Sequence, residues 1–380
     1  MTTNYKDHLF HPLEISICGH SGSGKSTLIE KLIKKFSPSF NIGYIKHDSH
    51  KFEMDKKGKD TFRAKAAGAT NMAISSPNSN AILSNNQNNK FIFRQNFVDS
   101  DIVFIEGYKK SLCHKILMWT DSDDDKTLLK QYLDDGKQNL LAIIGESEYA
   151  PVDSIRYFNR DNIDQIYTFI RDFWDKEISA RPLYGLILSG GRSIRMGEDK
   201  SAISYHGNTQ TTYLYNILAK FTQETYVSCR AEQKNNSHLS PYPNIDDRFV
   251  GFGPTGGILS AFQKHPNAAW LVVACDMPFI SSEAIFDLIK RRNPYKLATC
   301  FLNEEKNWPE PLCAIYEPKA ALKLGQFLAM GKPCPRKVLM NSNIQSLRAV
   351  DQKILGNVNT MDEFKIARSQ IQAMGMNDEN

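Results

Sequence analysis

Two glycine-rich turns, each directly after a short apolar run, constrain the fold of this chain more than any other feature. The first turn covers residues 19–27 after the run 15–18, and the second covers 189–200 after the run 186–188. A glycine-rich turn between an apolar strand and a helix is typical of the opening of an α/β domain. With 380 residues the chain is also too long for one hydrophobic core. We therefore predict two α/β domains, one for each turn.

An apolar stripe of helical spacing over residues 162–174 marks the boundary between the two parts. The polar segment after it ends in Pro182. We predict a first domain over residues 1–176, a short linker over 177–182 and a second domain over 183–380.

In both domains short apolar runs alternate with helical patterns, which predicts mostly parallel sheets. The Asn- and Ser-rich stretch 75–90 is predicted to be a loop around a weak strand at 81–83. The other predicted strands are 42–45, 101–105, 115–119 and 140–144 in the first domain, and 225–228, 270–274, 296–301 and 312–316 in the second.

The bulk composition argues against several classes of protein. A net charge of +5 without a Lys/Arg run suits small anionic ligands better than nucleic acid. The seven cysteines never form a C-x-x-C pair, which argues against a disulfide framework or a zinc site and fits a reducing cytosol. The N-terminus has no apolar signal core, and no stretch approaches the roughly 18 apolar residues of a membrane span. We expect a cytoplasmic protein without nucleic-acid or membrane partners.

The first turn, GHSGSGKST, fits the phosphate-binding pattern G-x-x-x-x-G-K-[ST] in full. Its glycines allow successive backbone N–H groups to point at a phosphate, where side chains would collide. Lys25 would supply positive charge to the β- and γ-phosphates, the Ser26 hydroxyl would ligate Mg²⁺, and the following helix presents its positive end. The predicted nucleotide contacts are Gly19, Ser21, Gly22, Gly24, Lys25, Ser26 and Thr27.

Such a loop needs an acidic group at the end of a neighbouring strand to hold the metal ion or its water. Glu106 has this position after a buried run, whereas Asp101 at the other end of that run is interpreted as a strand-entry residue. His47 and His50 raise the question of a shared metal ion. A polar loop is the other interpretation, and we favour it because no third ligand is near in the sequence.

Three segments of the first domain resemble the GTP-binding accessory protein of molybdopterin-guanine dinucleotide synthesis. They are the phosphate-binding turn, IKHDSHKFEMDKKGKDTFRAKAAGA at 45–69 and FIEGYK at 104–109. The similarity extends over about residues 12–175 and implies GTP rather than ATP, weak hydrolysis and a dimer-forming α/β domain. Without a clear N-K-x-D motif, the guanine base is implied by the resemblance alone. The resemblance assigns phosphate and Mg²⁺ to Lys25, Ser26 and Glu106, and its second signature contains Asp55, Gly58, Lys59 and Asp60.

The second turn, LSGGRSIRMGEDK at 188–200, has a different pattern. Paired glycines directly after a strand allow a base and ribose to lie against the backbone. Arg195 and Lys200 would then reach the triphosphate, where positive charge stabilises the α-phosphate in the transition state and the departing pyrophosphate. A solvated basic loop is the alternative. The predicted GTP contacts in this turn are Leu188, Ser189, Gly190, Gly191 and Lys200.

Two further segments favour a nucleotide site in the second domain. GPTGG at 253–257 predicts a tight turn that opens a helix, which would bring Gly253 and Pro254 near the nucleotide. WLVVACDMP at 270–278 predicts a buried strand with Asp276 at its carboxyl end, where α/β sheets bind ligands. We predict that Asp276 binds Mg²⁺ and contacts GTP, with a role in a turn before Pro278 as the alternative.

These motifs resemble molybdenum cofactor guanylyltransferase over about residues 183–375, as do PEPLCAIY at 309–316 and NVNT at 357–360. The resemblance implies transfer of GMP from GTP to molybdopterin with release of pyrophosphate. It implies that Arg195, Lys200 and Asp276 are the catalytic residues.

The same resemblance places Asp246 at a nucleotide-contacting position, and a solvated loop carboxylate is an equally good interpretation. It places Asn357 and Asn359 near the pterin or metal, with capping of the final helix as the alternative. Ser189 stands where the family usually has alanine, and HGNTQ at 206–210 is more polar than the usual segment.

Together the resemblances imply an α/β fold of two domains, a P-loop NTPase-like domain followed by a Rossmann-like nucleotidyltransferase domain. The pterin's own phosphate would attack GTP, so catalysis requires positioning and charge neutralisation rather than a nucleophile of the protein. The alternatives are cytidylyl transfer to molybdopterin, nucleotidyl transfer to a sugar phosphate, and a GTP-switched cofactor carrier. The joint presence of Arg195, Lys200 and Asp276 argues against a carrier.

The implied substrates are GTP and molybdopterin, with Mg²⁺ as the cofactor. The resemblance further implies a homodimer formed through the first domain. A molybdenum-insertion protein and the recipient molybdoenzymes are the expected protein partners.

Overall fold

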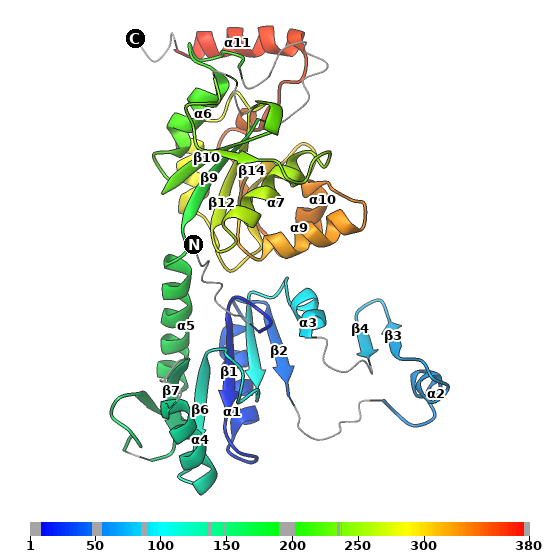
Figure 1. Cartoon of the computed structure of the whole chain (residues 1–380), viewed down its shortest axis with the longest axis vertical. Coiled ribbons are helices and arrows are strands. Elements are labelled where there is room, and N and C mark those ends of the chain that lie inside the picture. The colour runs from blue at the N-terminus through cyan, green and yellow to red at the C-terminus, as the bar shows by residue number, and fades with distance from the viewer. Residues whose placement is uncertain are drawn as a thin grey trace. The chain divides into compact units, whose positions relative to one another are not determined.

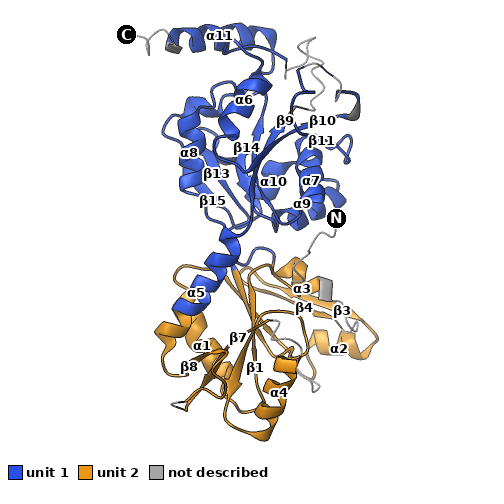
Figure 2. Cartoon of the chain, turned by 60° about the vertical axis from the view of Figure 1, so that its left-hand side comes forward, with its two compact units in different colours: residues 1–5, 98–101, 168–380 blue, residues 6–97, 102–167 orange. Residues whose placement is uncertain are grey.

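The structure is a computed structural model, which describes residues 9–47, 55–84, 90–134, 139–147, 149–189, 202–233, 236 and 238–375. The chain divides into two compact units, as Figure 2 shows. Unit 1 contains residues 1–5, 98–101 and 168–380, and unit 2 contains residues 6–97 and 102–167. Each unit has its own β-sheet with helices, which confirms the predicted α/β fold.

Helix α5 (Ile163–Ser179) begins in unit 2 and ends in unit 1. It includes the first three residues of the segment 177–182. The exact position of the boundary between the domains stays a prediction.

Over its described residues, unit 2 contains a six-stranded sheet in the order β2-β5-β1-β6-β7-β8, with every pair parallel (Figure 1). β1 and β5 are buried along their whole length, which explains their uninterrupted apolar runs. The strands are β1 (Glu14–Cys18), β2 (Ile42–Lys46), β5 (Ile102–Glu106), β6 (Lys115–Trp119), β7 (Leu140–Gly145) and β8 (Arg156–Asn159). The helices are α1 (Lys25–Phe36), α3 (Lys90–Asn96) and α4 (Asp123–Asp134).

An antiparallel hairpin of β3 (Asn71–Ser75) and β4 (Asn80–Ser84) follows the short helix α2 (Asp60–Ala66). β4 confirms the weak strand expected at 81–83. Its partner β3 was not predicted, because its sequence NMAIS gives only a short apolar signal.

The described part of unit 1 contains a seven-stranded mixed sheet in the order β11-β10-β9-β12-β14-β13-β15. β14 is antiparallel to both β12 and β13, and the other neighbours in this sheet are parallel, as the prediction of mostly parallel sheets allows. Only residues 304–307 separate β13 from β14, and a parallel crossover needs many more residues than that. The strands are β9 (Leu183–Leu188), β10 (Glu224–Cys229), β11 (Asn244–Asp246), β12 (Ala269–Ala274), β13 (Ala298–Asn303), β14 (Trp308–Tyr316) and β15 (Gln345–Arg348).

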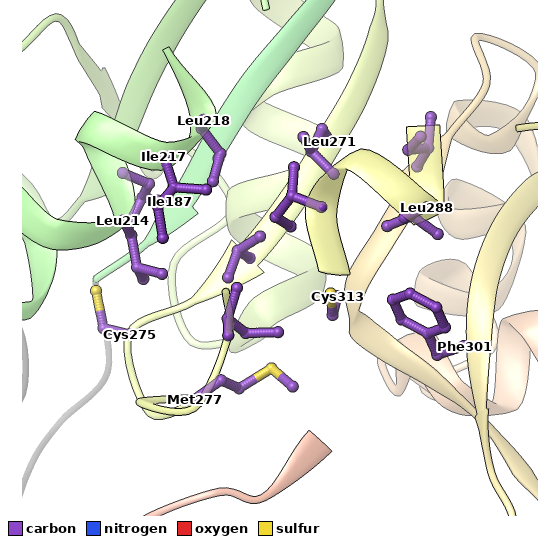
Figure 3. Packing of buried hydrophobic residues seen from close by; sticks show 14 of the residues in the cluster. Ile187, Leu214, Ile217, Leu218, Leu271, Cys275, Met277, Leu288, Phe301 and Cys313 are labelled. Atoms are coloured by element: carbon purple, nitrogen blue, oxygen red, sulfur yellow. The ribbon is translucent and has the colours of Figure 1, made fainter. Parts of the chain in front are cut away.

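Successive residues of β9 and β12 point to opposite faces of this sheet and enter two apolar clusters. Ile187 and Leu271 pack with residues of α6 and α8 on one face, and Figure 3 shows part of this cluster. Leu186 and Trp270 pack on the other face with residues of α7, α9 and α10. The helices are α6 (Gln210–Leu218), α7 (Pro254–Lys264), α8 (Ser282–Lys290), α9 (Ala320–Ala329), α10 (Pro335–Met340) and α11 (Met361–Gly375), with 3-10 turns at Ala231–Gln233 and Gln352–Leu355.

The order of strands reverses beside β9. The chain passes from β9 to β10 and β11 on one side, and then returns to β12 on the other side. In α/β sheets, ligands bind beyond the carboxyl ends of the strands at such a reversal. Among the described helices, we find none with the length and hydropathy that a membrane span requires.

Candidate functional site

The predicted phosphate-binding loop lies between β1 and α1. Its glycines at 19, 22 and 24 have φ angles of 148°, 82° and 89°, in the region that favours glycine. A Cβ atom at Gly19 would lie 2.7 Å from the Ser23 Oγ, so the loop is closed tightly at this position. Residues 19–24 therefore have the glycine-dependent backbone that a phosphate cradle requires.

Glu106 ends β5 and pairs in register with Ile17 of the neighbouring strand β1. Its carboxylate is 6% exposed and accepts hydrogen bonds from the Ser26 hydroxyl at 3.0 and 3.1 Å and from the Tyr44 hydroxyl at 2.7 Å. The Lys46 Nζ lies 3.5 Å from the same carboxylate. The structure thus brings Ser26 and Glu106, the two residues predicted to handle Mg²⁺ in this domain, into direct contact.

Lys25 is the first residue of α1, and its Nζ donates a hydrogen bond to the His20 carbonyl at 2.5 Å. Burial lowers the pKa of Lys25, and the negative charge of Glu106 opposes this shift. A phosphate bound in the loop would raise the pKa of Lys25 in the same way as Glu106, because an adjacent anion favours the charged form of a lysine.

His20 of the loop has a partner that sequence reasoning missed. Its Nδ1 lies 3.0 Å from the Oδ1 of Asp125, a fully buried carboxylate in α4. Asp125 also accepts hydrogen bonds from the backbone N–H and the hydroxyl of Thr120, at 2.8 and 2.9 Å. Burial raises the pKa of Asp125, but the hydrogen bonds from His20 and Thr120 outweigh it and the net shift is downward. The pair was not foreseen because 105 positions separate its members.

The second signature of the first domain forms the start of α2. Asp55 accepts a hydrogen bond from the Thr61 hydroxyl at 2.7 Å, Gly58 has a φ of 88°, and Lys59 directly precedes the helix, whose first residue is Asp60. The structure therefore gives this segment a local folding role.

The remaining predicted residues of this domain lie as follows. Ser21 and Thr27 are exposed on the loop and the first turn of α1. The His47 ring lies 4.3 Å from the Tyr108 ring, centroid to centroid, and His50 lies outside the described residues. Within the described ranges, no group of three or more His, Cys, Asp or Glu side chains could hold a metal ion.

In unit 1, β9 and β12 are parallel neighbours, and Leu188 pairs with Ala274 at their carboxyl ends. The N–H of Cys275 donates to the Leu188 carbonyl at 3.2 Å. Ser189 and Asp276 therefore leave the sheet at the same edge, where the strand order reverses.

Ser189 is buried and ties β9 to β10. Its backbone N–H and its hydroxyl both donate to the Ser228 carbonyl, at 3.0 and 2.7 Å. The Ser189 hydroxyl, which the usual alanine would lack, thus forms a hydrogen bond within the sheet. The other predicted residues of this turn lie outside the described residues: Gly190, Gly191, Arg195 and Lys200.

The predicted turn GPTGG forms the start of α7, with Gly253 at a φ of 58° and Pro254 as the first helical residue. A Cβ atom at Gly257 would lie 2.6 Å from the Ser228 Oγ and 2.8 Å from a methyl carbon of Leu188. Glycine at this position therefore allows the positive end of α7 to pack directly on the ends of β9 and β10.

Asp246 is exposed at the end of β11, beside this edge of the sheet. The next residue, Asp247, is half-buried and accepts a hydrogen bond from the Ser228 hydroxyl. Burial raises the pKa of Asp247, and the bond from Ser228 opposes the shift. Sequence reasoning singled out Asp246 and overlooked its neighbour.

The NVNT segment reaches the end of β12, since the N–H of Val358 donates to the Asp276 carbonyl at 2.8 Å. Thr360 and Glu363 then form a capping box for α11. The Thr360 Oγ1 accepts from the Glu363 N–H at 3.3 Å, and the Glu363 carboxylate accepts from the Thr360 N–H at 3.1 Å. Thr360 is therefore the residue at the start of the cap, and the Asn359 N–H also donates to the Glu363 carboxylate, at 2.6 Å.

Glu310 is a second carboxylate at this edge that sequence reasoning did not single out. The last β12–β14 pair joins Val273 to Cys313, so Asp276 lies three residues beyond it and Glu310 three residues before it. Glu310 is 3% exposed, and its Oε1 accepts a hydrogen bond from the Leu312 N–H at 3.0 Å. Burial raises its pKa, and the charge of Asp276 adds to this shift. In the sequence Glu310 stands between two prolines, and its position in the sheet can be inferred only once the strand pairing is known.

Two protein-family descriptions match the chain. Residues 14–146 match molybdopterin guanine dinucleotide synthesis protein B (MobB), and residues 185–345 match the MobA-like NTP transferase domain.

Individual relatives match about half of the chain. A molybdenum cofactor biosynthesis bifunctional protein of Synechocystis sp. is 35% identical over 188 residues, which are 50% of this chain and 54% of that protein. A probable molybdenum cofactor guanylyltransferase of Bacillus mycoides is 26% identical over 195 residues, 49% of this chain and 96% of that protein. The crystal structure of molybdopterin-guanine dinucleotide biosynthesis protein A from Archaeoglobus fulgidus covers 50% of this chain and 99% of that chain, with 24% identity and a TM-score of 0.42. The chain thus spans about half the length of the Synechocystis relative.

Proposed function

Because this chain joins a MobB domain, residues 14–146, to a MobA-like NTP transferase domain, residues 185–345, we propose that it transfers GMP from GTP to molybdopterin. One observation carries the proposal. The glycine-rich turn and Asp276 leave neighbouring strands at the same edge, and the NVNT segment reaches the same point. The description of the Bacillus relative as a probable molybdenum cofactor guanylyltransferase supports it.

In the proposed reaction, a phosphate oxygen of molybdopterin attacks the α-phosphorus of GTP. A new P–O bond forms while the bond from the α-phosphorus to the bridging oxygen breaks, and pyrophosphate leaves with the electron pair. The attacking phosphate is already an anion, so no side chain has to remove a proton. Arg195 and Lys200 are proposed to neutralise the triphosphate and the departing pyrophosphate.

We assign Mg²⁺ to the carboxyl end of β12. This ion prefers oxygen ligands and commonly uses one or two carboxylates together with substrate phosphates. Asp276 lies three residues beyond the last β12–β14 pair and Glu310 three residues before it, so this part of the sheet offers carboxylate oxygens that fit the ion. Asp276 would hold it, and the bound ion would neutralise phosphate charge.

The remaining residues of the MobA-like domain are assigned to the two substrates. Asn357 and Asn359 are proposed to contact the pterin, because their segment reaches Asp276 from the side of α11. The segments that start α7 and end β9 and β11 would surround the nucleotide. The proposed GTP contacts are Leu188, Ser189, Gly190, Gly191, Lys200, Asp246, Gly253, Pro254 and Asp276.

The MobB domain is proposed to bind GTP with Mg²⁺ and to hydrolyse it weakly. The contact of Ser26 with Glu106 next to Lys25 supports this assignment. Fusion raises the effective concentration of each site for the other, so the nucleotide state of the MobB domain would affect cofactor binding or hand-over.

Partners and location follow from the same pathway. We propose a homodimer through the MobB domain, and contacts with a molybdenum-insertion protein and recipient molybdoenzymes. A cytoplasmic location is consistent with seven free cysteines.

The test is turnover by the full chain with molybdopterin, Mg²⁺ and either GTP or CTP, with products identified by mass spectrometry. We expect guanine dinucleotide and pyrophosphate in equal amounts with GTP, and no dinucleotide with CTP. Formation of a cytosine dinucleotide would support the proposed type of reaction and contradict GTP as its substrate. No dinucleotide with either, from folded protein, would favour a cofactor carrier.

A further inference from the structure

The MobA-like domain contains a group of charged and aromatic side chains of which only Glu310 has a place in the assignments above, as a carboxylate near the proposed Mg²⁺. Trp308 and Glu310 belong to the start of β14, Lys306 precedes that strand, and Arg336 lies in the first turn of α10. We refer to these four residues as the Trp308 cluster.

The Trp308 ring holds two cations near its face. The guanidinium carbon of Arg336 lies 4.3 Å from the ring centroid, and the Lys306 Nζ lies 5.6 Å from it. Cations at these distances are attracted by the quadrupole of the indole ring. Because α10 also packs on β14, two independent contacts fix the position of Arg336.

Arg336 has hydrogen-bonding capacity that the described residues do not use. Its Nε is buried and has no hydrogen-bond partner among them. A guanidinium group presents its donors in a planar fork that matches the oxygens of a phosphate. A phosphate monoester is therefore a ligand that this side chain is well suited to bind.

The Trp308 cluster belongs in part to β14, which pairs with β12, the strand that leads to Asp276. Trp308 and Glu310 are two residues apart at the start of β14. Burial is the largest cause of the raised pKa of Glu310, the charge of Arg336 opposes the shift and the charge of Asp276 adds to it. Glu310 is thus within electrostatic reach of both Arg336 and Asp276.

In the strand order β11-β10-β9-β12-β14, β14 lies on the other side of β12 from the proposed nucleotide contacts at the ends of β9 and β11. Transfer joins two substrates at one phosphorus atom, so the β14 side is available for the acceptor. The Thr255 hydroxyl donates to the Pro333 carbonyl at 2.8 Å, which ties the loop before α10 to the start of α7.

We propose that Arg336, held on the Trp308 ring and assisted by Lys306, binds the terminal phosphate of the acceptor and directs it at the α-phosphorus of GTP. This inference rests on the proposed function. Arg336 is then a substrate-binding residue and Trp308 a positioning residue.

The first test measures steady-state kinetics of full-length variants. Arg336→Ala is expected to raise the KM for molybdopterin roughly 10- to 100-fold, the range for loss of a hydrogen bond to a charged group, and to leave the KM for GTP within about twofold. Arg336→Lys should be intermediate, because it keeps the charge and loses the fork. Trp308→Leu should raise the same KM by a smaller factor, and Trp308→Phe should restore part of the loss. Arg348→Ala is the matched control, since that side chain is 85% exposed in β15.

The second test measures binding without turnover, by calorimetric titration of nucleotide-free protein. Molybdopterin should bind Arg336→Ala more weakly than wild type by about the same factor as the change in KM. A dephosphorylated pterin should bind both proteins alike. Equal binding of the phosphorylated pterin to both would overturn the proposal.

The outcomes separate this inference from the proposed function. If wild type forms guanine dinucleotide and Arg336→Ala leaves the KM for molybdopterin unchanged, or raises the KM for GTP instead, the acceptor site is wrong and the function stands. If wild type forms no dinucleotide, the proposed function falls. A phosphate-dependent loss of pterin binding in Arg336→Ala would then still support the acceptor site.

Discussion

The two proposed nucleotide sites of this chain differ in how their parts are distributed along the sequence. The phosphate loop of the MobB domain is contiguous over residues 19–27 and takes one carboxylate, Glu106, from a neighbouring strand. The edge at β9 and β12 combines Ser189, Asp276 and the NVNT segment, which come from three separate stretches. A contiguous motif can be identified from sequence alone, whereas a dispersed site also depends on the order of strands.

The largest expected effect is at the dispersed site. Asp276→Asn should lower guanine dinucleotide formation roughly 10³-fold, because it removes the carboxylate charge at the reaction centre and keeps the shape of the side chain. GTP hydrolysis by the MobB domain should not change. Product formation and phosphate release are measured on the same samples, with the exposed Glu305→Gln as the control. Transfer at the wild-type rate in Asp276→Asn would remove this residue from the mechanism.

A second prediction concerns the frame of the dispersed site. Gly257→Ala should destabilise the MobA-like domain by about 1–3 kcal/mol, because its Cβ would crowd the Ser228 hydroxyl and a Leu188 methyl group. Gly325→Ala in α9 is the matched control. Apart from its chain neighbours and the backbone of its own helix, no atom of the described residues lies within 4 Å of the added Cβ, so the substitution should stabilise the protein by about 0.5–1 kcal/mol. Denaturant unfolding measures both variants, and equal changes would contradict the close packing of α7 on the strand ends.

The smallest predicted effect concerns the frame of the contiguous site. Asp125→Asn should lower the free energy of unfolding by about 1–2 kcal/mol at pH 7, since it weakens the hydrogen bonds to His20 and Thr120. The pKa of Asp125 is lower in the folded chain than its ordinary value of 3.8. The ionised carboxylate therefore stabilises the fold above about pH 4, and this contribution is lost as the pH falls through the folded pKa.

The difference between wild type and Asp125→Asn should accordingly shrink below about pH 4. The exposed Asp124→Asn in the same helical turn is the control and should show little change at any pH. An Asp125→Asn effect that stays constant down to pH 3 would contradict the role of its ionised form.

Sequence patterns predicted the α/β fold well because apolar runs and glycine turns are local signals. The hairpin β13–β14 was missed because β14 extends through Pro309 and Pro311, residues that do not signal a strand. That error also hid Glu310, because its place three residues before the last β12–β14 pair depends on the antiparallel pairing. The His20–Asp125 contact was missed for the same reason, since local patterns carry no information on which distant carboxylate a loop contacts.

The alternative interpretations also differ in whether they concern local contacts of the chain or contacts with a bound substrate. The cap of α11 depends on local geometry, because Thr360 and Glu363 form a capping box and the Asn359 N–H donates to the same Glu363 carboxylate. The assignments of Arg195, Lys200 and Asp246 concern bound substrates, so they stay predictions that the kinetic experiments test.

The most direct test of the account is the transfer rate of the full-length Lys25→Ala protein. With saturating GTP and molybdopterin we expect guanine dinucleotide formation within about twofold of wild type, while GTP hydrolysis by the MobB domain is lost and dinucleotide formation slows at limiting substrate. That result would place the chemistry at the dispersed site and leave the phosphate loop as an accessory. Loss of transfer at saturating substrates, in a folded protein, would show that the two sites act as one and would contradict the account.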